Sequence, residues 1–149
     1  GIGGLAYAGI PVTHRDTNQT VTFLTGHDQT GLVPDAIDWD AVAKGSPVIV
    51  MYMAMKHIDG IAHSLLKAGR RADEPVAFVC NAATNAQQVL ESTIGSAAKD
   101  AEAAGIEPPA IVVVGEVVRL RAGLDWLGAL TGRKLDADPL QQREVRDAG

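Results

Sequence analysis

The run Pro47-Val-Ile-Val-Met-Tyr-Met53 decides the fold of this chain. Its unbroken apolar character is typical of a strand that is buried on both faces of a sheet. Two similar runs follow at 75–80 and 110–115, and the β-branched residues of 20–25 predict a further strand. Stretches with helical spacing separate several of these runs. The sequence therefore predicts an α/β domain.

Two helices are expected between the apolar runs. Apolar residues of 55–68 recur at three- and four-residue spacing, and Gly69 is expected to end that helix. Thr84 and Gln87 have the spacing of a capping box, which predicts a second helix that continues to Gly105. Shorter helical segments are considered in 1–9, 38–43 and 125–130, and 117–121 is interpreted as an extension of the last strand past Gly115. The charged segment from Arg133 onward is interpreted as surface or as a docking segment.

The helical connections imply two right-handed crossovers, from 47–53 to 75–80 and on to 110–115. Ligands of such sheets bind beyond the carboxyl ends of the strands. This rule points to three segments that would share one edge of the sheet, at 52–54, 81–83 and 115–116.

Composition excludes several functional classes. The chain has 149 residues and a net charge of -5, and aromatic residues make up 4% of it. That charge does not fit a nucleic-acid binder, and so few aromatics do not fit a platform for single strands. No apolar run approaches the roughly 20 residues of a membrane helix. Neither a nucleic-acid nor a membrane partner is expected, and a start without methionine or signal peptide suggests a domain cut from a longer protein.

Metal and nucleophile chemistry find little support in the residue spacing. No two of the four histidines have the i, i+4 spacing of ligands on one helix face. Cys80 is the single cysteine, so no intrachain disulfide can form and a reducing compartment is the natural interpretation. Its place at a strand end fits a small buried apolar residue better than a thiolate nucleophile. No metal is therefore expected.

Each of three sequence features has two interpretations that the residues alone do not distinguish. The turn Asn81-Ala-Ala-Thr84 either lets a flat ligand approach the backbone or simply joins two elements. Met53 either covers a ligand at a strand exit or fills the core. Arg15 either binds a carboxylate through its planar guanidinium or sits in a solvated, salt-bridged loop.

Five segments, taken in order, resemble the uroporphyrinogen-III C-methyltransferases of the tetrapyrrole methylase family. The resemblance extends over nearly the whole chain. The segments are Ala6-Tyr-Ala-Gly-Ile-Pro-Val-Thr-His-Arg15, Val21-Thr-Phe-Leu-Thr-Gly-His27, Val50-Met-Tyr-Met53, Pro75-Val-Ala-Phe-Val-Cys-Asn-Ala-Ala-Thr84 and Pro109-Ala-Ile-Val-Val-Val-Gly-Glu-Val-Val118.

The resemblance implies a fold and an activity. It implies that 1–149 is the C-terminal (second) domain of a two-domain enzyme, with a mixed sheet of about five strands and flanking helices. It also implies S-adenosyl-L-methionine as methyl donor and uroporphyrinogen III as substrate, which is methylated at C2 and C7 to precorrin-2 for cobalamin or siroheme synthesis. A cytoplasmic homodimer is expected.

Site residues follow from the resemblance position by position. Met53, Ala82, Pro109 and Ala110 correspond to donor-binding positions, and Arg15 and Met53 are expected at the substrate. The family's glycine- and proline-rich loops and a Thr-Ala pair are missing. The isolated chain is therefore expected to be inactive and to need its own N-terminal domain, and no catalytic base is assigned. Alternatives are a methyltransferase for a later corrinoid precursor and a non-catalytic binding or dimerisation module of the same fold.

Overall fold

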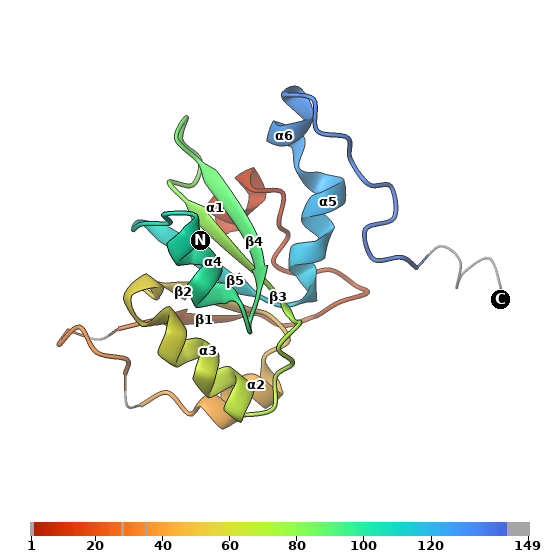
Figure 1. Cartoon of the computed structure of the whole chain (residues 1–149). Coiled ribbons are helices and arrows are strands. Elements are labelled where there is room, and N and C mark those ends of the chain that lie inside the picture. The colour runs from red at the N-terminus through yellow and green to blue at the C-terminus, as the bar shows by residue number, and fades with distance from the viewer. Residues whose placement is uncertain (1, 28, 35, 143–149) are drawn as a thin grey trace.

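A five-stranded mixed sheet forms the centre of the domain in the computed structural model, which describes residues 2–27, 29–34 and 36–142 (Figure 1). The strand order is β1-β2-β5-β3-β4. β1 is parallel to β2, whereas β5 is antiparallel to both β2 and β3, and β4 is antiparallel to β3. The strands are β1 (Thr22–Thr25), β2 (Ile49–Tyr52), β3 (Pro75–Cys80), β4 (Gln88–Thr93) and β5 (Ala110–Val114).

Helices cover both faces of this sheet. Ile49 and Met51 of β2 pack in one core cluster with α2, α3 and α4, whereas Val48 and Val50 pack in the other with α1 and η2. This alternation follows from the two-residue period of a strand. It confirms the predicted α/β fold with a sandwiched mixed sheet. The helices are α1 (Ile2–Tyr7), α2 (Trp39–Gly45), η1 (Met55–His57), α3 (Ile58–Lys67), α4 (Ala97–Ala103), η2 (Glu116–Leu120), α5 (Arg121–Leu124) and α6 (Trp126–Leu130).

The helix predicted from Thr84 to Gly105 was wrong in its first half. Residues 88–93 form β4 instead, which pairs with β3 from Cys80↔Gln88 to Pro75↔Thr93. Thr84 donates its hydroxyl hydrogen to the carbonyl of Asn81 at 2.7 Å and so stabilises a turn, not a helix start. The free edge of β3 offers a full set of backbone partners, and that pairing outweighs the local helical pattern.

The predicted direction of the third apolar run was also wrong. Because the β3–β4 hairpin adds one reversal of the chain before α4, β5 returns antiparallel to β3. The edge that holds the carboxyl ends of β2 and β3 therefore holds Ala110, the first residue of β5, and 115–116 lie at the opposite edge. Residues 117–121, which were expected to extend the strand, are helical instead: 117–120 belong to the 3₁₀ helix η2 and Arg121 begins α5.

The remaining short helices were anticipated in part. Residues 2–7 form α1 despite two internal glycines, and helices also occur within 38–45 and 125–130. The segment from Arg133 to Gln142 contains no helix or strand, and the rest of the predicted docking segment, 143–149, lies outside the described residues.

Candidate functional site

A cavity of about 640 Å³ opens at the edge of the sheet where β2 and β3 end and β5 begins. Its walls come from four separate chain segments and are mostly apolar. The residues that line it are His27, Tyr52, Met53, Met55, Lys56, Val79, Asn81, Ala82, Thr84, Pro108, Pro109, Ala110 and Ile111.

The backbone turns sharply where the strands enter the cavity. The φ angles are 51° at Met53, 46° at Asn81 and 62° at Ala83, all in the left-handed region that residues with a Cβ rarely adopt. Such conformations are concentrated at ligand-binding and active sites in proteins. A hydrogen bond of 3.1 Å from the Asn81 N–H to the Pro109 carbonyl joins two of the walls.

Four of the five predicted site residues come together in this cavity. Met53, Ala82, Pro109 and Ala110 all line it, and 53% of Met53 is exposed there. The structure does not bring Arg15 to them. Arg15 is an exposed residue in the turn that the His14–Asn18 bridge closes, ahead of β1 and therefore at the opposite end of that strand.

The end of β1 adds one cavity residue, His27, that the sequence did not predict. Gly26 donates its N–H to the Tyr52 carbonyl at 2.7 Å, and a Cβ at Gly26 would lie 2.3 Å from the Cα of Ala54. Only glycine permits this approach, which brings His27 beside the exit of β2. The parallel pairing of β1 with β2 was the missing signal, because it sets both carboxyl ends at one edge.

The surroundings of Cys80 favour a structural role for its side chain. It is 4% exposed, and its thiol donates a hydrogen bond of 2.9 Å to the Glu107 carbonyl. A buried thiol with this partner supports the strand end next to the cavity. Within the described ranges, no group of three or more histidine, cysteine, aspartate or glutamate side chains is arranged to hold a metal ion.

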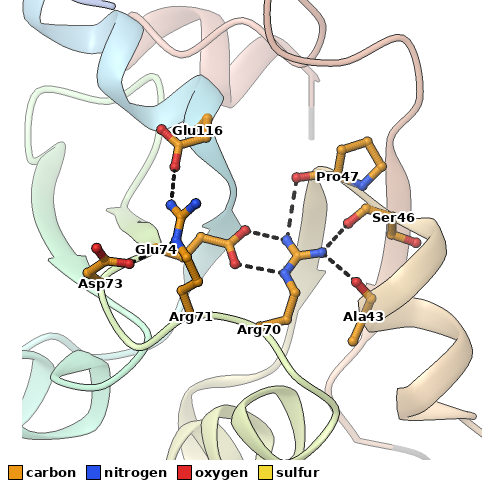
Figure 2. A network of polar contacts seen from close by, with 8 residues as sticks. All are labelled: Ala43, Ser46, Pro47, Arg70, Arg71, Asp73, Glu74 and Glu116. Atoms are coloured by element: carbon orange, nitrogen blue, oxygen red, sulfur yellow. Dashed lines mark hydrogen bonds and ion pairs between the residues drawn. The ribbon is translucent and has the colours of Figure 1, made fainter.

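The opposite end of the sheet carries a network of ion pairs and hydrogen bonds (Figure 2). The Arg70 guanidinium forms a two-pronged pair with Glu74, and both side chains are 11% exposed. It also donates to the carbonyls of Ala43 at 2.9 Å and Ser46 at 2.6 Å, next to the end of α2. Arg70 thus satisfies carbonyls that a helix end leaves without partners.

Arg71 extends this network on the surface. It donates to Asp73 at 2.9 Å and to Glu116 at 2.8 Å. The bond to Asp73, and after it the bond to Glu116, raises the pKa of the Arg71 guanidinium above the ordinary value. Arg71 therefore stays charged.

A second ion cluster fastens the last helices. Asp125 is 4% exposed and contacts Arg121 at 3.0 Å and Arg133 at 2.7 Å, and Arg121 and Arg133 also reach Glu91 of β4. Burial raises the pKa of Asp125, but hydrogen bonds from Arg133 and the Gly128 N–H and the charges of both arginines outweigh it, so the pKa lies below the ordinary 3.8.

Comparison with known proteins identifies the class of protein. The family of tetrapyrrole (corrin/porphyrin) methylases matches residues 2–98. The chain belongs to this family.

Individual relatives narrow the class. The chain is 70% identical over 147 residues to uroporphyrinogen-III C-methyltransferase of a Sinorhizobium species, which covers 99% of the chain and 52% of the relative. It is 38% identical over 132 residues to siroheme synthase of Zymomonas mobilis, covering 89% of the chain and 27% of that protein. The chain therefore spans about half or less of these relatives.

A solved structure shows the same fold. The uroporphyrin-III C-methyltransferase of Thermus thermophilus in complex with S-adenosyl homocysteine is 29% identical, with a TM-score of 0.66 over 78% of this chain and 48% of that one. No helix in the described part of this chain has the length and apolar character needed to cross a bilayer.

Proposed function

We propose that this chain is the second domain of an S-adenosyl-L-methionine-dependent uroporphyrinogen-III C-methyltransferase. The observation that carries the proposal is the meeting of Met53, Ala82, Pro109 and Ala110 in one cavity. These are the positions that resemblance assigns to the donor. They come from three different segments. If β5 ran parallel to β3, as the alternation of strands and helices in the sequence predicted, residues 109–110 would lie at the opposite edge of the sheet.

The cavity fits the proposed donor. Its volume of about 640 Å³ lies within the roughly 300–1,000 Å³ of small-molecule sites. Mostly apolar walls suit a flat adenine, and the turns at Asn81 and Ala83 bring main-chain groups to the edge of the space. The relative from Thermus thermophilus was solved with the demethylated donor, which supports this assignment.

When bound, S-adenosyl-L-methionine supplies a methyl group activated by its sulfonium charge. The residues of this chain hold that group rather than react with it: Met53 contacts the donor at the exit of β2, and 109–111 contact it at the start of the neighbouring strand β5. Correct alignment of two reacting groups contributes up to roughly 7–11 kcal/mol in well-oriented systems.

The proposal also includes a role for Arg15 in binding the substrate, away from the donor cavity. Uroporphyrinogen III carries many carboxylates, and Arg15 is an exposed cation on an acidic chain. Its distance along β1 from the cavity means that it would meet a part of the substrate away from the reacting carbon. The N-terminal domain, homodimerisation and a cytoplasmic location complete the proposal.

The test is a methylation assay on the full-length protein that carries this chain. Incubation with donor and uroporphyrinogen III should give precorrin-2, detected by its absorbance, whereas the isolated 149-residue chain should give none. Turnover by the isolated chain at the full-length rate would disprove the two-domain assignment. Donor binding by the full-length protein without methylation of this substrate would favour a later corrinoid precursor, and absence of donor binding would favour a non-catalytic module.

A further inference from the structure

Helix α1 lies directly behind one wall of the cavity. A Cβ at Gly4 would lie 2.9 Å from the Cβ of Ala82 and 3.1 Å from Cδ1 of Ile111, and both of these residues line the cavity. The same construction at Gly3 meets nothing within 4 Å. Two adjacent glycines of one helix thus differ completely in surroundings, and Gly4 is the one that permits close contact with the cavity wall.

Gln87 ties the same wall to the end of α1. Its side-chain Oε1 accepts a hydrogen bond from the Ala83 N–H at 2.9 Å, and its Nε2 donates to the Tyr7 carbonyl at 3.2 Å. Tyr7 is the last residue of α1, and the final carbonyls of a helix have no partner within the helix. A single half-buried amide therefore joins the helix end to the cavity turn.

The turn needs such support because of its backbone. Asn81 and Ala83 both have left-handed φ angles, of 46° and 62°, on either side of Ala82. L-residues disfavour this region, since the Cβ approaches the following carbonyl oxygen. The bond from Gln87 falls on the amide of Ala83 itself and so favours the arrangement in which the turn faces α1.

We propose that Gln87 is a positioning residue for the methyl donor. Together with Gly4, Gln87 fixes the turn 81–84 against α1 and so keeps the backbone of Ala82 at the donor. Gln87 itself does not touch the donor. This inference rests on the proposed function, because it takes the cavity as the donor site. It adds a residue and a helix that the resemblance does not place at the donor.

The first test compares two neighbouring glutamines in the full-length protein. Gln87→Met keeps the shape of the side chain and removes both hydrogen bonds, and Gln88→Met makes the same change at an exposed position. S-adenosyl homocysteine affinity, measured by calorimetry, should fall about tenfold for Gln87→Met, equivalent to about 1.4 kcal/mol. It should be unchanged for Gln88→Met. Equal affinities of the two variants would overturn the inference.

A pH profile separates positioning from a general loss of stability. In Gln87→Glu the introduced carboxylate still accepts from Ala83 but cannot donate to Tyr7; once protonated, it can do both. Affinity relative to the unaltered protein should therefore be low at pH 7 and recover as the pH falls toward about 4.3, the ordinary pKa of a glutamate. A ratio that stays flat or falls with acidification would contradict the role of the Tyr7 bond.

The two glycines provide an independent pair of variants. Gly4→Ala and Gly3→Ala both favour the helix, but only the former pushes on Ala82. Gly4→Ala should weaken S-adenosyl homocysteine binding severalfold, and Gly3→Ala should leave it unchanged; equal binding would overturn the role of α1. If the unaltered protein binds no S-adenosyl homocysteine, the proposed function itself fails and this inference with it, an outcome distinct from equal binding by the variants.

Discussion

The two ends of the central sheet are built in opposite ways. At the end where β2 and β3 finish, the chain leaves an apolar cavity of about 640 Å³ and holds its backbone in left-handed turns. At the other end, Arg70 and Glu74 form a nearly buried pair that also binds carbonyls next to the end of α2 (Figure 2). One end thus has a larger, apolar cavity with strained backbone, while the other has charged groups that bind one another and nearby carbonyls.

If the cavity holds the donor, as proposed, this contrast separates the part of the domain that stabilises the fold from the part that binds the ligand. Left-handed residues cost free energy and persist only where the surrounding structure fixes them. The ion-paired end joins α2, the loop before β3 and η2, and it leaves the cavity end free to serve a ligand. Substitutions at the two ends should therefore change different quantities, folding stability at one and donor affinity at the other.

The largest effect is expected from Arg70→Ala. Removal of the guanidinium leaves the carboxylate of Glu74 buried without its counter-charge, which typically costs about 3–5 kcal/mol. Urea unfolding of the full-length protein should show that loss. The fraction that stays folded should bind S-adenosyl homocysteine with unchanged affinity. A stable variant with impaired binding would break the proposed division between the two ends.

Asp125→Asn should produce a smaller, pH-dependent loss. The pKa of Asp125 is lowered in the folded protein, so its contribution is fully present above the unfolded value near 3.8 and is lost as the pH falls from there through the lower, folded-state pKa. The variant should be less stable by about 1.5–3 kcal/mol at pH 7, since it loses charge-assisted bonds to two arginines. In unfolding curves measured at a series of pH values below 7, the difference in stability between the two proteins should shrink as the carboxylate of Asp125 becomes protonated in the folded protein. A difference that grows on acidification would contradict the pKa argument.

Met53→Ala should act on the donor and hardly on the fold. Because 53% of Met53 is exposed, its truncation removes little burial within the protein. Covering such a side chain with a ligand is worth about 1.5 kcal/mol or more, so S-adenosyl homocysteine affinity should fall about tenfold or more. Leu130→Ala, at a position that is 77% exposed and outside the cavity, is the matched control. A fall in melting temperature without a fall in affinity would favour core filling.

Arg15→Ala and Arg15→Lys should leave donor affinity unchanged. Arg15 lies at the opposite end of β1 from the cavity. If it binds a substrate carboxylate, both variants lose about 10- to 150-fold in substrate affinity, because lysine lacks the planar fork of arginine. Separate titrations with donor and substrate distinguish these effects. Unchanged substrate kinetics together with lower stability would support a solvated loop instead.

Much of the sheet could be predicted because burial on both faces leaves an unmistakable apolar run. This holds for β2, β3 and β5, and the spacing in 58–67 identified α3 in the same way. β4 was missed because its residues Gln88, Glu91 and Ser92 carry no apolar run; it exists through pairing with β3. The direction of β5 was missed for the same reason. An apolar run does not reveal which way its strand runs in the sheet, and the unpredicted β3–β4 hairpin reverses the chain before β5.

The site required more than local pattern. On the residues alone, the turn at Asn81 and the exit at Met53 each allowed a purely structural interpretation, and resemblance was needed to single out Met53, Ala82, Pro109 and Ala110. His27 and Gln87 were not predicted as site residues at all. Their roles depend on the parallel β1–β2 pairing and on the contact of α1 with the turn, which are tertiary features.

The most direct test of the account is a crystal structure of the full-length protein with S-adenosyl homocysteine. The account predicts the ligand in the cavity at the ends of β2 and β3, in contact with Met53, Ala82 and Ala110. The Arg70–Glu74 network at the opposite end should be unchanged. Ligand bound elsewhere, with this cavity filled by another part of the protein, would contradict the central claim.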